Sequence, residues 1–179
     1  MDLCLSGSIE KRSLAEGNQF LLQIVSYTLI LNPQKRKIFI AKRISGDERL
    51  KNSFCLGFGG HVSLEDFSIP AEYSSNPIMN AAIRELREEL NIKNKTLNIE
   101  HLGYTRDLTS STSEHLGVIF VLTTGSTSIR ETDKLTGFWI SYDKLKEEYY
   151  GKLESWSKHI LDHIYESKSL AEKYGFANM

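Results

Sequence analysis

Residues 81–90 read AAIRELREEL, and this stretch indicates both the local fold and the chemistry that it serves. Residues three and four apart are neighbours on an α-helix, so Glu85, Glu88 and Glu89 would share one face of such a helix. The aliphatic residues between them fall on another face, which can pack against a hydrophobic core. The pattern therefore predicts an amphipathic helix with a cluster of carboxylates on one side.

The carboxylate cluster has two interpretations. Like charges at these spacings repel one another by a few tenths of a kcal/mol for each close pair, and a bound divalent cation would turn that repulsion into binding energy. Hard oxygen ligands suit Mg²⁺, with Mn²⁺ as an alternative. The other interpretation is a solvated helix on which Arg84 and Arg87 pair with the glutamates at the surface. Residues 81–90 alone favour the solvated helix, and the sequence upstream of them shifts the balance toward a metal site.

The boundaries of this helix can be predicted from its flanking residues. Asn76 is a suitable N-cap, and Pro77 is favoured at the first helical position. The helix is expected to run from Pro77 to Leu90, with Asn91 in the left-handed conformation that usually belongs to a C-terminal glycine.

The segments before the helix read as strands. Residues 20–31 are rich in Leu, Ile, Val, Tyr and Thr. In 36–42, Ile38, Ile40 and Lys42 would fall on one face of a strand, and Lys37, Phe39 and Ala41 on the other. A turn signal at 32–35 separates them, so we expect a hairpin. The glycine-rich sequence FCLGFGG at 54–60 would form a short strand end, and a loop from 61 to about 76 leads into the helix.

The segments after the helix complete an α+β pattern. Residues 97–108, 115–123 and 137–142 read as strands, a helical segment begins at 143–148, and 153–173 reads as one closing amphipathic helix. This order predicts a central mixed β-sheet sandwiched between α-helices rather than a regular βαβ alternation. We expect one domain over residues 1–179.

A motif joins the glycine-rich strand end to the carboxylate helix. Gly60 is followed after five residues by Asp66 and then, after a longer gap, by Arg84-Glu85-Leu86-Arg87-Glu88-Glu89. This arrangement resembles the Nudix box, here spanning 60–92. The Gly59-Gly60-His61 opening and the His115-Leu116-Gly117 strand are most similar to the predicted Nudix phosphoesterase branch of that superfamily. The expected strand order agrees with a Nudix fold over most of the chain.

The chain also departs from the family pattern. Asp66 stands where the family has glutamate, although the adjacent Glu65 offers the usual residue type. The insertion at 67–83 lengthens the gap before the helix, which a loop tolerates at small entropic cost. Asn91 replaces a glycine.

The resemblance implies roles for particular residues. Glu85, Glu88 and Glu89 would be metal ligands, with the main-chain carbonyl of Gly59 completing the site. Arg84 would orient Glu85 through a salt bridge, together with Asp66 or Glu65. The expected catalytic residues are Glu85, Glu88, Arg84 and Glu131.

Glu131 enters because the family often takes a further carboxylate from a loop before a tryptophan-containing strand. Asp133 is a second choice and Glu114 a weaker third, and all of them are equally compatible with ordinary loop charges. His61 and His115 could contact phosphate, although a histidine at a strand end is more often structural.

The resemblance implies a magnesium-dependent hydrolase that cleaves a phosphoanhydride bond of a nucleoside diphosphate-linked substrate by attack of water on phosphorus. One alternative is a non-catalytic Nudix module that senses a ligand. Another is an enzyme like isopentenyl diphosphate isomerase, which Cys55 and Gly60-His61 suggest. That alternative is disfavoured because no histidine precedes His61 to supply the N-terminal ligands of those enzymes.

Composition is consistent with this function. The chain has 179 residues and a net charge of -1, so no basic surface indicates nucleic acid or an anionic membrane as a partner. Its two cysteines cannot form a disulfide framework, and no signal peptide or membrane-spanning run is recognised. We expect a cytoplasmic protein that binds a small phosphorylated molecule, with a homodimer as one possible state.

Overall fold

A mixed β-sheet forms the centre of the computed structural model, which describes residues 7–18, 20–45, 53–68, 74–93, 96–108 and 113–177. Five strands lie in the order β3-β2-β1-β6-β5, while β4 also pairs with β1 and β7 pairs with β2. Only the β1–β6 pair among these is parallel. The strands are β1 (Gln23–Asn32), β2 (Lys37–Arg43), β3 (Phe54–Cys55), β4 (Gly57–Phe58), β5 (Ile99–Thr105), β6 (His115–Thr123) and β7 (Leu135–Ser141).

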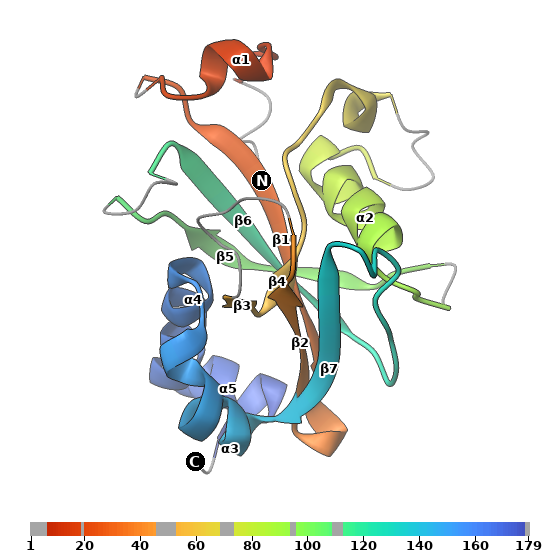
Figure 1. Cartoon of the computed structure of the whole chain (residues 1–179), viewed down its shortest axis with the longest axis vertical. Helices are drawn as coiled ribbons and strands as arrows, with labels where there is room; N and C mark the ends of the chain where they lie inside the picture. Colours follow the sequence, from red (N-terminus) through yellow and green to blue (C-terminus); the bar gives the residue numbers. More distant parts are fainter. Residues whose placement is uncertain are drawn as a thin grey trace.

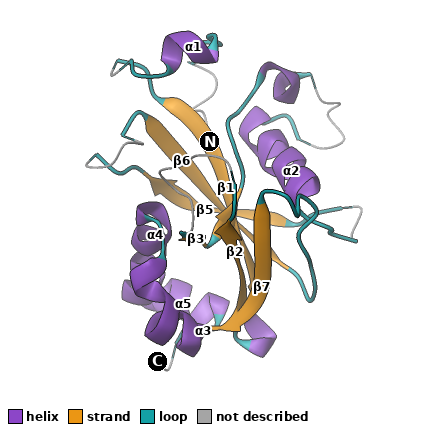
Figure 2. Cartoon of the chain, in the orientation of Figure 1, coloured by secondary structure: helices purple, strands orange, loops and turns teal. Residues whose placement is uncertain are grey.

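Helices cover both faces of the sheet, as Figures 1 and 2 show: α2 lies on one side, and α3, α4 and α5 lie on the other. A short helix, α1, lies beyond the starts of β1 and β6. The α-helices are α1 (Arg12–Ala15), α2 (Pro77–Glu89), α3 (Tyr142–Lys144), α4 (Ser155–Glu166) and α5 (Lys168–Tyr174). A π-helical turn follows α3 at Leu145–Tyr149, and 3-10 turns lie at Pro33–Lys35, Leu64–Phe67 and Tyr150–Lys152.

Alternation along the strands divides the core between the two faces. Leu29 and Leu31 of β1 pack in the cluster under α4 and α5, whereas Ile30 packs with Leu86 of α2 on the opposite face. Successive side chains of a strand point to opposite faces, so each central strand contributes to both cores. The predicted fold class, a mixed sheet between helical layers, is confirmed.

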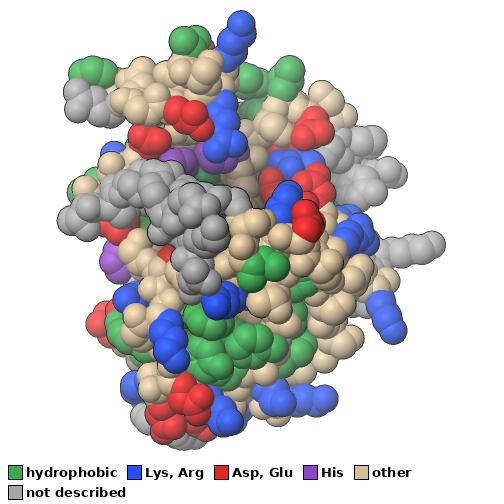
Figure 3. Space-filling model, viewed as in Figure 1, with side chains coloured by type: hydrophobic (Ala, Val, Ile, Leu, Met, Phe, Trp, Pro, Cys, Tyr) green, Lys and Arg blue, Asp and Glu red, His purple; other side chains and the backbone are tan. Residues whose placement is uncertain are grey.

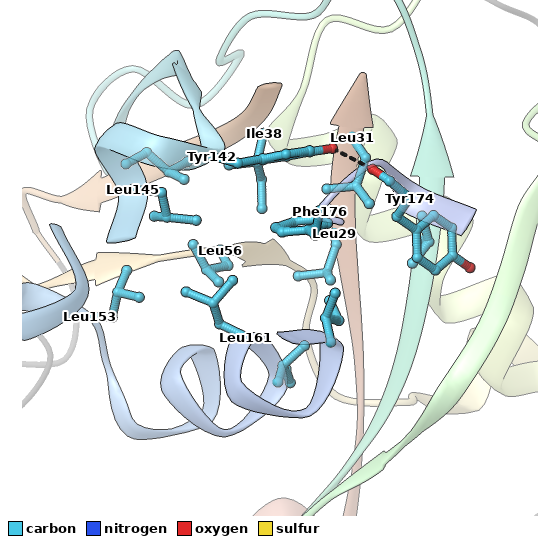
Figure 4. Close-up of a cluster of buried hydrophobic side chains, with 14 of the residues drawn as sticks. Leu29, Leu31, Ile38, Leu56, Tyr142, Leu145, Leu153, Leu161, Tyr174 and Phe176 are labelled. Atoms are coloured by element: carbon cyan, nitrogen blue, oxygen red, sulfur yellow. Dashed lines mark hydrogen bonds between the residues drawn. The ribbon is translucent and has the colours of Figure 1, made fainter. Parts of the chain in front are cut away.

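The larger core closes the C-terminal part of the chain against the sheet (Figure 4). The Tyr142 ring stacks on the Phe176 ring with their centroids 3.7 Å apart, and the Tyr142 hydroxyl donates to the Tyr174 carbonyl at 3.0 Å. A buried hydroxyl needs such a partner to avoid a desolvation penalty.

The start of α2 follows the sequence prediction, but its end does not. The Asn76 side chain accepts from the Ile78 N–H, and Pro77 opens the helix. Asn91 does not take the left-handed conformation, so that prediction is wrong: Leu90 is extended, and the Asn91 N–H donates to the Ser128 carbonyl at 2.8 Å. Pairing with this distant segment satisfies the polar groups that a left-handed cap would otherwise satisfy.

The prediction of one closing helix over 153–173 is also wrong. Ser167 has an extended backbone that separates α4 from α5, and its hydroxyl caps α5 by accepting from the Leu170 N–H. The break turns the chain so that Tyr174 and Phe176 reach the core. Within the described residues, no helix is long and apolar enough to cross a membrane.

Candidate active site

The carboxylate face of α2 is fixed by the packing of the opposite face. Ile78, Ala82 and Leu86 are fully buried against the sheet. Their burial turns the glutamates toward the segment that follows β4, and the exposed fraction of the side chain is 16% for Glu85 and 52% for Glu88. The acidic face therefore runs from a partly buried carboxylate to an exposed one.

Arg84 is the centre of the charged network. Its Nε and Nη2 donate to the two oxygens of Asp66 at 2.9 and 3.1 Å, and its Nη1 donates to Glu85 at 2.7 Å. Nη2 also donates to the His61 carbonyl at 3.1 Å. The guanidinium thereby ties Glu85 to the chain that leaves the glycine-rich strand end.

The structure distinguishes Asp66 from Glu65. Asp66 is fully buried, and one of its oxygens also accepts from the backbone N–H and hydroxyl of Ser63. Glu65 lies 3.5 Å from Arg84 with 68% of its side chain exposed. Asp66 is thus the fixed partner of Arg84, and Glu65 is a peripheral charge.

Two glycines bring the backbone close to the carboxylates. Gly59 has φ of 154°, and a Cβ there would overlap the carbonyl oxygen of Ser26. Its N–H donates to Glu89 at 3.1 Å. A Cβ on Gly60 would overlap the carboxylate of Glu85. Gly59 therefore requires glycine because its backbone packs against β1, whereas a side chain at Gly60 would displace the Glu85 carboxylate.

The pKa values of the carboxylates show that their negative charges lie close together. Burial, followed by the carboxylates of Glu85 and Glu131, raises the pKa of Glu89 to about 8, against the opposing effects of Arg43 and the Gly59 N–H. Burial also raises the pKa of Glu85, and Arg84 opposes that rise. These carboxylates are costly to ionise together without a cation.

Glu131 reaches the same cluster through backbone pairing. The Arg130 N–H donates to the Glu89 carbonyl at 2.7 Å, and Leu90 bridges to Ile129. Glu131 follows directly, acts electrostatically on Glu89, and pairs with Lys134 at 2.8 Å. The segment after β6 therefore delivers a further carboxylate to the end of α2.

The weaker candidates lie elsewhere. The Asp133 side chain is exposed, and its carbonyl accepts from the Ser45 hydroxyl at 2.9 Å. Glu114 accepts from the Gly17 N–H at 3.2 Å and so belongs to the contact between α1 and the start of β6.

Two histidines lie beside the network. Nε2 of His61 and Nε2 of His115 are 3.1 Å apart. Burial, with a smaller effect of Arg12, lowers the pKa of His61 to about 4. Figure 3 shows histidine side chains between the region of α1 and the mixed acidic and basic side chains near α2, all on one face.

The carboxylates do not form a closed cage for an ion. Among the residues that the structure describes, no three His, Cys, Asp or Glu side chains converge closely enough to hold one metal ion. Glu85 and Glu89 instead accept from Arg84 and Gly59. The donor set still fits a divalent cation bound through oxygen, because adjacent carboxylates with raised pKa values gain most from a positive charge.

Sequence reasoning missed Arg43. Its positive charge acts on Glu89 from the end of β2, and it lies 3.8 Å from Glu154. Strand alternation places Arg43 on the same side as Phe39 and Ala41, which pack in the cluster under α2. This alternation is the sequence feature that could have identified Arg43.

Cys55 does not match a catalytic thiol. It is buried, its Sγ donates to the Ala41 carbonyl at 3.5 Å, and burial raises its pKa. A reactive cysteine needs a lowered pKa, so Cys55 gives no support to the isomerase alternative. Cys4 lies outside the described residues.

Comparison with known proteins places this geometry in a superfamily. No protein-family model matches the sequence. Protein YmaB of Bacillus subtilis (strain 168) is 29% identical over 160 residues, which is 85% of this chain and 75% of YmaB. The crystal structure of Tm1382, a proposed Nudix hydrolase, superposes with a TM-score of 0.69 and 28% identity over 87% of this chain and 76% of its own. The chain belongs to the Nudix superfamily of hydrolases.

Other solved structures share the fold at lower identity. The MutT protein of Methanosarcina mazei Go1 has a TM-score of 0.59 at 16% identity, covering 80% of this chain and 92% of its own. DR0079 of Deinococcus radiodurans has a TM-score of 0.57 at 17% identity, covering 79% and 82%. These structures confirm the predicted fold, and Tm1382 supports the predicted superfamily membership.

Proposed function

We propose that this Nudix protein is a cytoplasmic, magnesium-dependent hydrolase of a phosphoanhydride bond in a small nucleoside diphosphate-linked substrate. The observation that carries the proposal is the environment of Glu89. This partly buried carboxylate has Glu85 and Glu131 as acidic neighbours. Stability alone gives no reason to crowd three carboxylates at one helix end, whereas binding a cation and a polyphosphate does.

The metal-binding role is assigned to the acidic face of α2. Glu85, Glu88 and Glu89, with the carbonyl of Gly59, would hold Mg²⁺. The ion would supply charge neutralisation of the phosphate oxygens and a lowered pKa for water. Asp66 keeps the guanidinium of Arg84 in place, and Arg84 keeps Glu85 oriented for this role.

Proton transfer is assigned to Glu131. The carboxylate lies beside Glu89 but belongs to a separate segment, so it can accept a proton from the attacking water while α2 holds the cation. Water attacks phosphorus, the bond to the bridging oxygen breaks, and two phosphorylated fragments leave. The adjacent Lys134 keeps the carboxylate positioned.

The test is turnover across a panel of nucleoside triphosphates, ADP-ribose, dinucleoside polyphosphates and nucleotide sugars, with and without Mg²⁺. The Glu89→Gln variant is expected to abolish metal-dependent turnover. Glu166→Gln, on the exposed side of α4, is the matched control and should retain it. Turnover that survives Glu89→Gln, or that needs no metal, would refute the proposal. Ligand binding without any turnover would identify a sensor instead.

A further inference from the structure

β7 is an edge strand of the central sheet. Its seven residues, Leu135–Ser141, run in unbroken antiparallel register with β2. Figures 1 and 2 show β7 at the margin of the sheet. Within the part of the chain that the structure describes, β2 is the only strand that pairs with it. Such an edge offers a row of N–H and carbonyl groups to a further strand.

A hydrogen bond at the end of β7 shows which of its backbone groups point outward. The Tyr142 N–H donates to the Arg36 carbonyl at 3.1 Å, next to the start of β2. In an antiparallel pair, residues that bond to the neighbouring strand alternate with residues that do not. Counting back from Tyr142, the even-numbered residues of β7 bond to β2. Gly137 and Trp139 therefore direct their N–H and carbonyl groups away from β2.

Two other edges of the sheet are protected against pairing with another chain. β5, at the opposite margin, is interrupted by a bulge between His101 and Gly103, and its Glu100 pairs with Lys173 of α5 at 2.7 Å. β3 has only two residues, and Leu153 bridges to its outer side. Bulges, charges, short lengths and covering segments are the usual protections of an edge. β7 is longer than β3, has no bulge and carries no charged side chain.

Exposed aromatic side chains adjoin the β7 edge on the face that α4 covers. Phe138 is 37% exposed. Its ring centroid lies 6.3 Å from that of Phe54 and 5.8 Å from that of Tyr149. Figure 3 shows hydrophobic side chains gathered between the C-terminal helices and β7. An apolar patch beside an open strand edge is typical of a surface that another protein covers.

The opposite face of β7 combines a large side chain with a missing one. Trp139 is half-buried, and its ring centroid lies 5.4 Å from that of Phe39. Gly137 has no side chain, and Ile129 lies where its Cβ would be. These two positions flank Phe138 on either side. If two copies of β7 ran antiparallel about a two-fold axis at Phe138, each Trp139 would lie opposite Gly137 of the other copy and could pack against its Ile129.

We propose that the outer edge of β7 is the interface with a second copy of this chain, which adds its own β7 antiparallel about a two-fold axis at Phe138. Gly137 of each copy exchanges two backbone hydrogen bonds with Trp139 of the other, which satisfies the outward groups of both strands. Phe138 lies opposite its counterpart in a pair without hydrogen bonds, where side chains are closest. Aromatic pairs stabilise such cross-strand contacts.

The second copy fits this edge better than a charged peptide does. The edge has no charged side chain to attract such a peptide. Its distinguishing features are the spacing of a glycine and a tryptophan around a phenylalanine, and the same strand in reverse direction complements that spacing. The same patch then serves both copies, as in a two-fold symmetric dimer.

The first test uses the unmodified protein. Sedimentation analysis from about 1 μM to about 1 mM should show a dimer at the higher concentrations. Hydrogen exchange followed by NMR should show that the Gly137 and Trp139 amides are protected in the dimer, while the Phe138 amide, which bonds to β2, is protected in both states. A monomer at every concentration would overturn the interface. A dimer in which the Gly137 and Trp139 amides exchange freely would overturn it as well.

The second test adds a charge to the edge. Thr136 is exposed, and a lysine on an edge strand opposes pairing with another chain. Thr136→Lys should be mostly monomeric at the concentration where the wild type is half dimeric, with an unchanged midpoint of urea unfolding for the monomer. Thr123→Lys, at the exposed end of β6, is the matched control and should dimerise like the wild type. Undiminished dimerisation of Thr136→Lys would show that the contact lies elsewhere.

The third test examines the register with two cysteine variants, both in a Cys4→Ser background. Phe138→Cys places two thiols directly opposite each other, with Cβ atoms about 5 Å apart. It should form an intermolecular disulfide under mild oxidation. Thr136→Cys is the matched control, because Ile140 of the other copy would lie opposite it, and it should not cross-link. A disulfide in both variants, in Thr136→Cys alone or in neither would overturn the proposed pairing.

Discussion

Arg84 donates two parallel hydrogen bonds, of 2.9 and 3.1 Å, to Asp66, although the two residues lie 18 positions apart. Asp66 is fully buried, and Arg84 keeps 16% of its side chain exposed. The pair therefore closes the loop before α2 onto the helix. In such a site, loss of one partner leaves an uncompensated buried charge.

Asp66→Asn should lower the free energy of unfolding by about 3 kcal/mol, because it leaves Arg84 without its buried counter-charge. Urea denaturation measures this loss. Glu65→Gln is the matched control, and its effect should stay under about 0.5 kcal/mol because Glu65 is exposed. Equal losses in the two variants would contradict the assignment of Asp66 as the partner of Arg84.

Gly59→Ala should destabilise the fold by about 3 kcal/mol or more. The new Cβ would overlap the Ser26 carbonyl, in a backbone conformation with φ of 154° that favours glycine. The melting temperature should fall by several degrees. Gly125→Ala serves as the control, since nothing lies within 4 Å of a Cβ there. A normal melting temperature for Gly59→Ala would show that the strand end can shift away from Ser26.

The metal-free protein should lose stability as the pH rises. Glu89 has a pKa of about 8, raised mainly by burial. Between its ordinary pKa and this value, the folded state binds more protons than the unfolded state, so the free energy of unfolding falls with increasing pH. Urea denaturation at several pH values from about 5 to 8 measures the slope. Glu89→Gln should flatten it, and the same slope in the variant would exclude Glu89 as its source.

Glu131→Gln should lower kcat by about 100-fold, the effect of removing a general base. Affinity for Mg²⁺ should change little, because the α2 carboxylates remain. Asp133→Asn is the control, since that side chain is exposed and outside the carboxylate cluster. If Asp133→Asn lowers kcat strongly and Glu131→Gln does not, Asp133 rather than Glu131 accepts the proton.

Cys55 should resist thiol reagents in the folded protein and react in urea, because burial raises its pKa. Mass spectrometry after labelling locates the modified residue. Cys55→Ser should retain hydrolytic activity. Rapid labelling of Cys55 in the native protein, or loss of turnover by a folded Cys55→Ser variant, would instead indicate a catalytic thiol.

Local patterns were sufficient to predict most of the fold. Apolar, strand-favouring side chains predicted β1, β2 and β6, because each of these strands buries side chains on both faces of the sheet. Asn76 and Pro77 fixed the start of α2, since capping depends on neighbours in sequence. Asn91 and Ser167 were misjudged because distant segments determine their conformations.

The part of the site that lies on α2 could be predicted from the helical spacing of its glutamates. Glu85, Glu88 and Glu89 share a face of α2 because of helix geometry, and family resemblance directed attention to Glu131. The choice of Asp66 over Glu65 depended on which side chain the loop buries. The His61–His115 pair was hidden for another reason: β1 separates the two residues in the sheet, and only tertiary structure brings their rings together.

The attachment of residues 128–131 to the end of α2 has an evolutionary consequence. Hydrogen bonds from Asn91 to Ser128 and from Arg130 to Glu89 clamp the two carboxylate-bearing segments to each other. The chain between them includes β5 and β6 of the sheet, so only the loops that join these strands can vary in length without altering the spacing of Glu89 and Glu131. Changes in those loops can therefore alter the surroundings of the site while the acidic centre is kept as a single block.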